Sequence, residues 1–598
     1  MQVALVALDG VVVTATRSAS RVDETLADVT VISRRQLDTQ APGMSLGEVL
    51  QSLAGVQFAG NGGRGTAQTV SLRGTGSSHT LLLIDGVRYG SATWGSPALS
   101  NLPLEAIERI EVVKGPASAL YGSEAIGGVI QIFTQRGQGA GQPLLGQASV
   151  TVGGHGHHSA SAGLRGEQGA WDYQLRMGRV LEDGISATNA RSGYYHHPDR
   201  DGLAQTSVSA QVGWQLQPNW RLEGQWQRTD GKADADLGNT GDPFSQMRSQ
   251  VASLKLQGTL ARDWTSSLSV GRSYDDNATI GSAYDDGHFD TTQTEWKWDH
   301  QLRTRAGMVL AGLEHLTQEV DAQSLYMPQG YSQTRRSINA AFVGINGSAG
   351  RHTWQGNLRR DDNSQFGGFT TYGLGYGFQL LPGWRAYASH GRAMRAPSFN
   401  DLYYVESYPA PWNGNPHLKP EQAHNNEVGL EWTQGAHQAK LLHYRNRVSQ
   451  LIEQGTTQME NVAGTSKLNG WTASYAWQGQ GWKLRGSLDA LDAQDAHGER
   501  LKRRARQQLA LHVDKQLGAW TVGGSALRVG SRLDIDENYA TTRMPAYTRV
   551  DVHARWRINP EWSLLARVVN LTDRDYESTY GFNTLGRTGY LTLQWTMR

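Results

Sequence analysis

SLRGTGSSHTLLLIDGVRYG (residues 71–90) and IERIEVVKGPASALYGSEAIGGVIQIF (residues 107–133) form the stretch around which the rest of the chain is organised. Short β-prone runs at residues 80–84, 109–113 and 128–133 are separated by Asp-Gly, Lys-Gly-Pro and Tyr-Gly, which are turn-forming combinations. Turns at this density predict a compact, loop-rich domain. They exclude a domain built from long helices.

The bulk composition limits the classes of protein that fit. The chain has 598 residues, which predicts more than one domain, and a formal net charge of +1. With no basic cluster, this balance gives no argument for nucleic-acid binding. The chain contains no cysteine, 71 glycines, and 19 Trp and 22 Tyr against 10 Phe. Absence of cysteine suits an exported protein, although cytosolic proteins also lack it.

After about residue 137 the sequence changes to strict alternation. In residues 372–380, Tyr, Leu, Tyr, Phe and Leu alternate with Gly or Gln, the turn Leu-Pro-Gly follows, and alternation resumes at Trp384. Residues 471–477 and 482–488 repeat the pattern. A period of two interrupted by tight turns predicts antiparallel hairpins.

The connections between these hairpins alternate in length. Short turns such as residues 217–219 alternate with long polar loops at residues 183–202, 231–247 and 403–417. No run of 18 apolar residues is present, which excludes a transmembrane helix, and the mean hydropathy is −0.51. Strands of a transmembrane barrel also average as polar, and excess Trp and Tyr suits its interfacial girdles. Composition alone leaves a membrane barrel and a soluble all-β protein both open.

Two runs carry a resemblance to a known family. LIDGV (residues 83–87) and VKGPASALYGSEAIGGVI (residues 113–130) resemble the plug signatures of TonB-dependent outer-membrane transporters. RGTGSSHTLLLIDGVR and RDDNSQFG (residues 360–367) are most similar to the cobalamin-transporting members, and the match extends in pieces from residue 9 to residue 589. The resemblance implies an all-β membrane protein, a 22-stranded antiparallel transmembrane β-barrel with an N-terminal α+β plug domain in its lumen. The expected divisions are residues 1–19, 20–136 and 137–598.

The resemblance also implies a function without catalysis. The expected activity is TonB-dependent uptake of cobalamin or a related corrinoid across the outer membrane of a Gram-negative bacterium. The expected partners are TonB with ExbB and ExbD, and the protein is expected to be a monomer among outer-membrane lipid and lipopolysaccharide. A ferric siderophore or heme is the nearer alternative cargo. A soluble all-β carbohydrate-binding or structural protein is the alternative from another class. No nucleophile elbow or His-Glu-x-x-His motif points to an enzyme.

The N-terminal run DGVVVTATR (residues 9–17) has two interpretations. Taken alone, it is the first strand of the plug or a frayed tail. The resemblance instead implies a TonB box, an extended segment that pairs with the edge of a partner's sheet. The residues assigned to it are Asp9, Val11, Val12, Val13, Thr14 and Ala15.

Two glycine-rich, small-polar segments, residues 60–68 and 89–96, interrupt the plug. Each could be an ordinary surface loop, and neither carries the GKS or GKT of a phosphate loop. The resemblance places both at the plug apex, facing the substrate. The expected contact residues are Asn61, Arg64, Gln68, Tyr89, Ser91, Trp94 and Ser96.

Aspartates gather in two of the long loops, HHPDRDG and DADLGNTGD. Acidic turns are common and this is no EF-hand, but calcium takes six to eight oxygen ligands and two such loops could converge on it. The resemblance implies calcium ligands at Asp199, Asp201, Asp234 and Asp242, with a further family aspartate replaced by Ser186. The histidines in GGHGHH (residues 153–158), His196 and His197 are expected to be solvated loop residues.

Charged plug residues suggest how the plug is held. Arg73 and Lys114 are expected to face the barrel wall, where Glu421 and Glu427 are the candidate partners. A charge buried in such an interface must be paired or it costs several kcal/mol. His79 is expected to be packed or hydrogen-bonded inside the plug.

Overall fold

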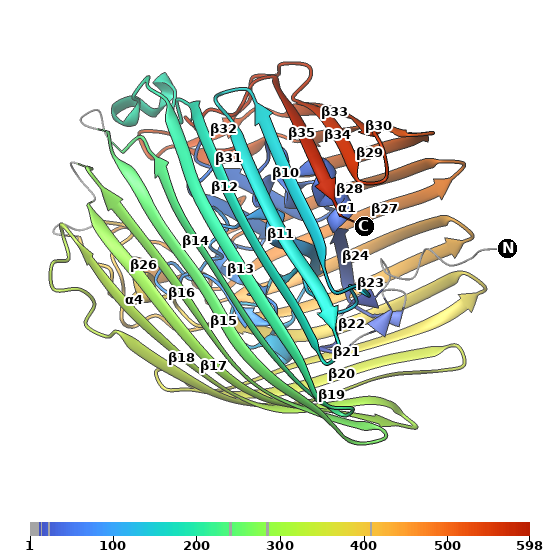
Figure 1. Cartoon of the computed structure of the whole chain (residues 1–598). Helices are drawn as coiled ribbons and strands as arrows, with labels where there is room; N and C mark the ends of the chain where they lie inside the picture. Colours follow the sequence, from blue (N-terminus) through green and yellow to red (C-terminus); the bar gives the residue numbers. More distant parts are fainter. Residues whose placement is uncertain are drawn as a thin grey trace.

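The computed structural model describes residues 11–12, 15–18, 20–21, 24–237, 242–282, 286–406 and 410–597; the side chains of residues 11, 12, 20 and 194 are not part of this description. Within it, 22 strands form one closed antiparallel barrel, which confirms the predicted strand number (Figure 1). The barrel strands are β10 (Leu145–Gly153), β11 (His158–Gln168), β12 (Trp171–Ile185), β13 (Asp201–Gln217), β14 (Trp220–Asp234), β15 (Phe244–Ala261), β16 (Trp264–Ile280), β17 (Gly287–Thr304), β18 (Gly307–Ser324), β19 (Arg335–Ala349), β20 (His352–Asn363), β21 (Gly367–Leu381), β22 (Trp384–Arg395), β23 (Glu421–Gln434), β24 (His437–Ser449), β27 (Thr465–Gly479), β28 (Trp482–Gln494), β29 (Gln507–Leu517), β30 (Trp520–Val529), β33 (Tyr547–Arg557), β34 (Trp562–Val569) and β35 (Thr588–Thr596).

The barrel closes where its first and last strands pair. β10 and β35 run antiparallel, with Ser149 opposite Gln594 and Val152 opposite Leu591. Closure removes the free edges that would otherwise invite pairing with another chain.

Turns of two to four residues join the strands at one end, and most of the connections at the other end are longer loops, as expected of a membrane barrel. The long loops contain short elements of their own. These are η4 (Ala190–Tyr195), α4 (Phe399–Tyr403), β25 (Ile452–Gln454), β26 (Met459–Asn461), β31 (Arg532–Ile535) and β32 (Thr541–Met544).

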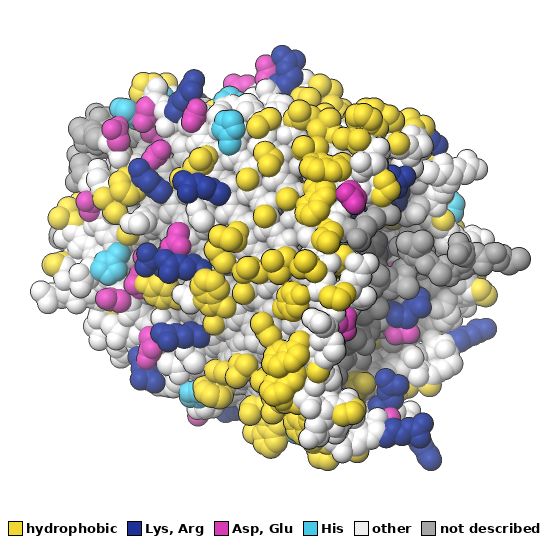
Figure 2. Space-filling view, in the orientation of Figure 1, with side chains coloured by type: hydrophobic (Ala, Val, Ile, Leu, Met, Phe, Trp, Pro, Cys, Tyr) yellow, Lys and Arg dark blue, Asp and Glu magenta, His cyan; other side chains and the backbone are white. Residues whose placement is uncertain are grey.

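The predicted alternation separates an apolar outer wall from a polar lumen. On β21, Leu374 and Tyr376 point outward and are 59% and 50% exposed, while Thr371 faces inward, is buried, and donates a hydrogen bond to the backbone carbonyl of Ser118 in the plug at 3.2 Å. Figure 2 shows hydrophobic side chains spread over the outer face of the barrel. Stacked Trp171–Trp214 and Trp520–Trp556 pairs lie near the short turns, with ring centroids 4.7 and 5.5 Å apart. Tryptophans at this level suit the aromatic girdle of a bilayer interface.

The plug lies inside the ring of barrel strands (Figure 1). Its central sheet has the order β3-β8-β9-β6-β7, and a separate hairpin joins β4 to β5. The predicted β runs at residues 80–84, 109–113 and 128–133 lie in three of these strands. The plug strands are β3 (Asp28–Ser33), β4 (Val56–Gly60), β5 (Gln68–Leu72), β6 (Thr80–Ile84), β7 (Val87–Arg88), β8 (Ile107–Lys114) and β9 (Gly128–Thr134).

Short helices complete the plug: α1 (Arg34–Gln40), α2 (Leu46–Gln51), α3 (Ser118–Tyr121), η2 (Ser77–His79) and η3 (Leu104–Ala106). Ser45 caps α2 by accepting a hydrogen bond from the backbone N–H of Glu48 at 3.3 Å, as is usual for serine at this position. A buried apolar core joins the sheet to α2 through Val49, Leu72 and Ile110. None of the helices among the described residues has both the length and the apolar character needed to cross a bilayer.

Candidate functional site

Trp94 stands at the tip of the plug segment that comprises residues 91–96. A bridge pairs Ser91 with Ser96, and Gly95 N–H donates to Ser91 O at 2.8 Å. The backbone N–H of Trp94 also donates to Ser91 Oγ at 3.1 Å. This tight turn holds the Trp94 side chain outward, where it is 55% exposed, although Ala92 and Thr93 beside it are buried.

The exposed tryptophan is continuous with aromatic side chains of the barrel. Its ring lies 5.9 Å from that of Phe289 on β17, and Phe289 lies 6.3 Å from Tyr404, which follows α4. We call Trp94, Phe289 and Tyr404 the apex aromatic surface. A buried cluster that includes Ala92, Phe399 and Leu402 supports it from below, and contributions come from both plug and barrel. The surface can therefore contact a large, partly apolar ligand.

The other predicted contact residues occupy different environments. Asn61, Arg64, Gln68, Ser91 and Ser96 are half-buried in their loops. Tyr89 differs from the expectation, because its side chain is only 3% exposed and packs in the plug core against Val251 and its neighbours. An aromatic side chain beside a glycine-rich segment can pack in the core as readily as it can lie on the surface, and Tyr89 packs in the core.

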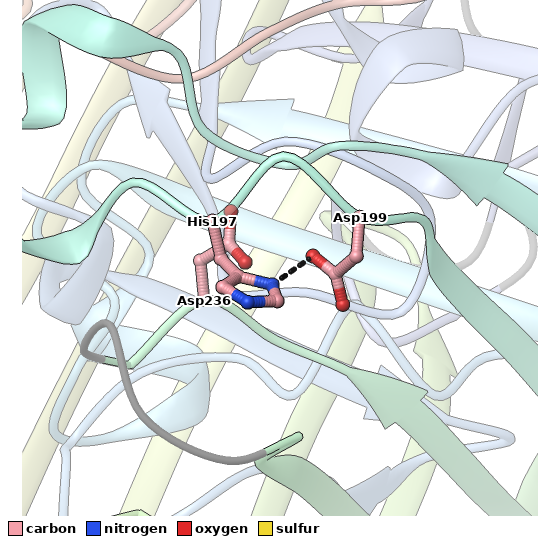
Figure 3. A group of neighbouring side chains, drawn as sticks. All are labelled: His197, Asp199 and Asp236. Carbon is pink, nitrogen blue, oxygen red and sulfur yellow. Dashed lines mark ion pairs between the residues drawn. The ribbon is translucent and has the colours of Figure 1, made fainter.

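The predicted acidic loops converge on one group (Figure 3). Ligand atoms of His197, Asp199 and Asp236 lie within 4.8 Å of one another, and their side chains point together between the β12–β13 and β14–β15 loops. His197 Nδ1 lies 2.8 Å from Asp199 Oδ1, and this hydrogen bond raises the pKa of His197. Burial raises the pKa of Asp236, and the neighbouring Asp199 charge raises it further.

Three of the four predicted calcium ligands belong to this neighbourhood. Asp201 accepts a hydrogen bond from Ala187 N–H at 2.6 Å. The negative charges of Asp236, Asp199 and Asp234 repel its carboxylate. Asp234 accepts from Gly202 N–H at 3.2 Å. Asp242 is exposed beyond the undescribed residues 238–241 and lies outside the group of three. Asp236 was not among the predicted ligands, because nothing in DADLGNTGD distinguishes its alternate aspartates.

Ser186 lies against the same loop. Its hydroxyl donates to the backbone carbonyls of His197 and Thr188 at 2.9 and 2.8 Å. The position expected to carry an aspartate in relatives thus supports the loop backbone here and adds no negative charge.

Arg73 and Glu427 form the central ion pair between plug and barrel. Arg73 Nη1 lies 2.5 Å from Glu427 Oε1, and both side chains are buried. Arg73 Nη2 also contacts Asp28 of the plug at 3.1 Å. Lys114, expected to face a barrel glutamate, pairs instead with Asp28 at 3.1 Å, because the β3–β8 register sets Asp28 opposite Lys114. Asp28 extends the network to the barrel through Lys440, also at 3.1 Å.

Glu421 faces the plug through a different partner from those expected. His79 Nε2 lies 2.8 Å from Glu421 Oε2, and Arg395 Nη1 contacts the same oxygen at 2.9 Å. His79 is thus a hydrogen-bonded plug histidine, as predicted. Its partner lies on the barrel and could not be identified from the sequence.

A closed barrel with an apolar outer wall, filled by a separately folded domain held through buried charges, defines the class of plugged transmembrane barrels. Residues 21–129 match the family model described as "TonB-dependent Receptor Plug Domain" and residues 144–571 the model "TonB dependent receptor-like, beta-barrel". The chain belongs to the family of TonB-dependent receptors. It is therefore a protein of the Gram-negative outer membrane, and its family consists of receptors and transporters.

Curated relatives and solved structures agree with this assignment. The chain is 31% identical over 603 residues to the "Vitamin B12 transporter BtuB" of Photobacterium profundum, covering 98% of this chain and 95% of that protein. It is 30% identical over 626 residues to the protein of the same name from Vibrio cholerae, covering 98% and 94%.

Among solved structures, the ferric enterobactin receptor PfeA of Pseudomonas aeruginosa superposes with a TM-score of 0.81 at 19% identity, covering 98% of this chain and 100% of that one. The siderophore receptor PirA of Acinetobacter baumannii gives 0.82 at 17%, covering 95% and 98%. At such identities the structural likeness concerns the fold alone.

Proposed function

We propose that this TonB-dependent transporter carries cobalamin or a related corrinoid inward across the outer membrane, without breaking any bond in its cargo. The observation that carries the proposal is the 30–31% identity, over nearly the whole chain, to proteins named vitamin B12 transporters. The apex aromatic surface supports it, because a bulky ligand with an apolar body needs contacts spread over both plug and barrel.

A ferric siderophore is the second candidate cargo, and heme is a related one. PfeA and PirA, which superpose well on this chain, are a ferric enterobactin receptor and a siderophore receptor. Their identities of 17–19% concern architecture, so the relatives with higher identity favour the corrinoid.

We assign the coupling to TonB to the segment at residues 9–15. Val11 and Val12 form strand β1, which pairs antiparallel with Ser20–Arg21 (β2). Ala15 is buried, whereas Asp9, Val13 and Thr14 lie outside the described residues. A short strand with one neighbour has a free edge on which a partner strand can pair, and that partner would be TonB, acting with ExbB and ExbD.

Calcium is the proposed resident ion of the loop group. Carboxylate oxygens are the ligands that calcium prefers, and Asp199, Asp201, Asp234 and Asp236 approach one another, with His197 beside Asp199 and Asp236. Burial is the main cause of the raised pKa of Asp236, and repulsion from the neighbouring Asp199 adds to it, so a divalent cation that compensates this carboxylate charge fits the donor set. Bound calcium would neutralise this repulsion and tie the β12–β13 loop to the β14–β15 loop.

Equilibrium binding tests the proposed cargo. Outer membranes containing the protein are titrated with labelled cyanocobalamin, and separately with ferric enterobactin and with heme. We expect saturable, nanomolar-range binding of cyanocobalamin and none of the other two. Saturable binding of a ferric chelate or of heme without corrinoid binding would replace the proposal by the alternative.

A further inference from the structure

A polar cavity of about 110 Å³ separates the plug from one sector of the barrel wall. On the barrel side, the inward positions carry small or medium polar residues such as Ser149, Thr151, Ser161 and Thr592. Because side chains of this size do not reach the plug, they leave a gap, which we call the slot. Its plug side is formed by α1 and residues 41–43.

The slot runs along the barrel axis. Its lining on β10 extends from Gln147 to Thr151, which are five residues that span about 13 Å of extended strand. Arg64 of the apex loop and His157 of the β10–β11 turn lie at the long-loop end, and Arg555 and Gln594 lie toward the short turns. The slot therefore leads from the apex toward the periplasmic end.

Five arginines border the slot; Arg179 is exposed on the outward face of β12, and two of the other four have carboxylate partners. Arg34 contacts Asp38 at 2.7 Å and Arg64 contacts Glu182 at 3.5 Å. The remaining pair, Arg176 and Arg555, forms no ion pair within the part of the chain that the structure describes.

These two guanidinium groups are held by neutral oxygens. Arg176, 5% exposed, donates to the side-chain carbonyls of Gln135 and Gln147 at 2.9 and 2.7 Å. Arg555 donates to the side-chain carbonyl of Gln594 at 3.1 Å and to the backbone carbonyl of Asp38 at 3.0 Å. Both nearby acids are engaged elsewhere, because Asp38 pairs with Arg34 and Glu105 accepts from Ser207.

Buried positive charge without a counter-ion is costly, and an arginine fork matches the geometry of phosphate and carboxylate groups. We propose that Arg176 and Arg555 are transient partners for an anionic group of the cargo as it passes along the slot. This inference rests on the proposed function, and the anionic group of cobalamin is the phosphodiester of its nucleotide loop. The slot is far smaller than a corrinoid, so passage requires the plug to shift, after which these two arginines face the enlarged path.

Uptake of two corrinoids that differ in this group tests the proposal. Labelled cyanocobalamin, which has the phosphodiester, and dicyanocobinamide, which lacks it, are supplied to cells without another corrinoid transporter. We expect Arg176→Gln and Arg555→Gln each to lower cyanocobalamin uptake about tenfold, with cobinamide uptake and cyanocobalamin binding unchanged. Arg176→Lys, which keeps the charge, should retain most of the uptake. The matched control is Arg528→Gln, an exposed outward-facing arginine on β30.

The outcomes separate the two proposals. Absence of corrinoid binding by the unaltered protein would retire the corrinoid assignment. With binding intact, an equal loss for both corrinoids, or no loss in either glutamine variant, would overturn the role of the arginines. Heat-modifiable gel mobility identifies a variant that fails to assemble. If one glutamine variant fails in this way, the other glutamine variant and Arg176→Lys test the role of the arginines. If the loss of charge is the cause, Arg176→Lys retains most of its uptake, whereas disturbed packing lowers it.

Discussion

Arg73 of the plug and Glu427 of the barrel join the two domains through a contact of 2.5 Å between Nη1 and Oε1. Their side chains are 4% and 3% exposed, so each charge relies on the other; Arg73 also contacts Asp28 at 3.1 Å, and Glu427 accepts a hydrogen bond from Asn425 Nδ2 at 2.7 Å. This pairing makes the plug interface depend on opposite charges contributed by separate domains.

Replacing one member of the pair should loosen the plug. In Glu427→Gln, Arg73 keeps only Asp28, and removing one partner of a buried pair costs about 3–5 kcal/mol. We expect cells carrying this variant to become more sensitive to vancomycin, which is too large for an intact plugged barrel. The double variant Arg73→Gln/Glu427→Gln should be less sensitive than Glu427→Gln, because it leaves no buried arginine that has lost one of its two carboxylate partners, and Asp28 keeps Lys114 and Lys440. Equal sensitivity of the unaltered and Glu427→Gln proteins would contradict the role given to the pair.

Trp94 should contribute directly to cargo affinity. Its 55% exposed ring adjoins Phe289, and loss of a large aromatic contact costs on the order of 1–2 kcal/mol at a binding surface. Trp94→Ala should therefore weaken cyanocobalamin binding about tenfold in membrane titrations. Trp298→Ala is the control, because that side chain is comparably exposed, at 49%, but lies on the outer wall. An unchanged dissociation constant for Trp94→Ala would remove this residue from the site.

The sequence predicted the features that depend on local patterning. The period of two in residues 372–380 determines which side chains face lipid, and β21 has this alternation. The apex aromatic surface was only partly predictable, because Phe289 and Tyr404 reach Trp94 through closure of the barrel. The partner predicted for Lys114 was wrong because the register between β3 and β8 places Asp28 opposite it, and a single sequence does not reveal that register. Tyr89 shows that a glycine-rich neighbourhood does not establish exposure.

The loop carboxylates predict a calcium effect that grows with pH. Burial raises the pKa of Asp236, so the folded, metal-free protein favours the protonated form of this residue. The stability gained from this preference is fully present below the usual carboxyl pKa. That contribution is lost as pH rises through the raised pKa, because the ionised group is buried among like charges. Calcium binds the ionised form, so its stabilisation should increase over the same range, reaching about 2.7 kcal/mol at 100 times its dissociation constant.

Thermal unfolding in detergent, with calcium or with chelator, measures this effect. The difference in Tm should be larger at pH 8 than at pH 5 and should shrink strongly in Asp236→Asn. Asp263→Asn, in an exposed turn at the opposite end of the barrel, should leave the difference unchanged. A calcium effect that is absent at both pH values would remove the ion from the proposed function.

Coupling to TonB should depend on the backbone of the segment at residues 9–15. Val12 pairs with Ser20 in the β1–β2 hairpin, and pairing with a partner strand requires its N–H or that of a neighbour. Proline removes that donor and fixes φ, so Val12→Pro should lower cyanocobalamin uptake at least tenfold while binding at the cell surface is retained. Val12→Thr keeps both the donor and the β-branched shape and should transport normally.

Because binding occurs at the opposite end of the plug, a loss of binding in Val12→Pro would indicate a general disturbance of the plug. Normal uptake in that variant would mean that the partner engages another segment.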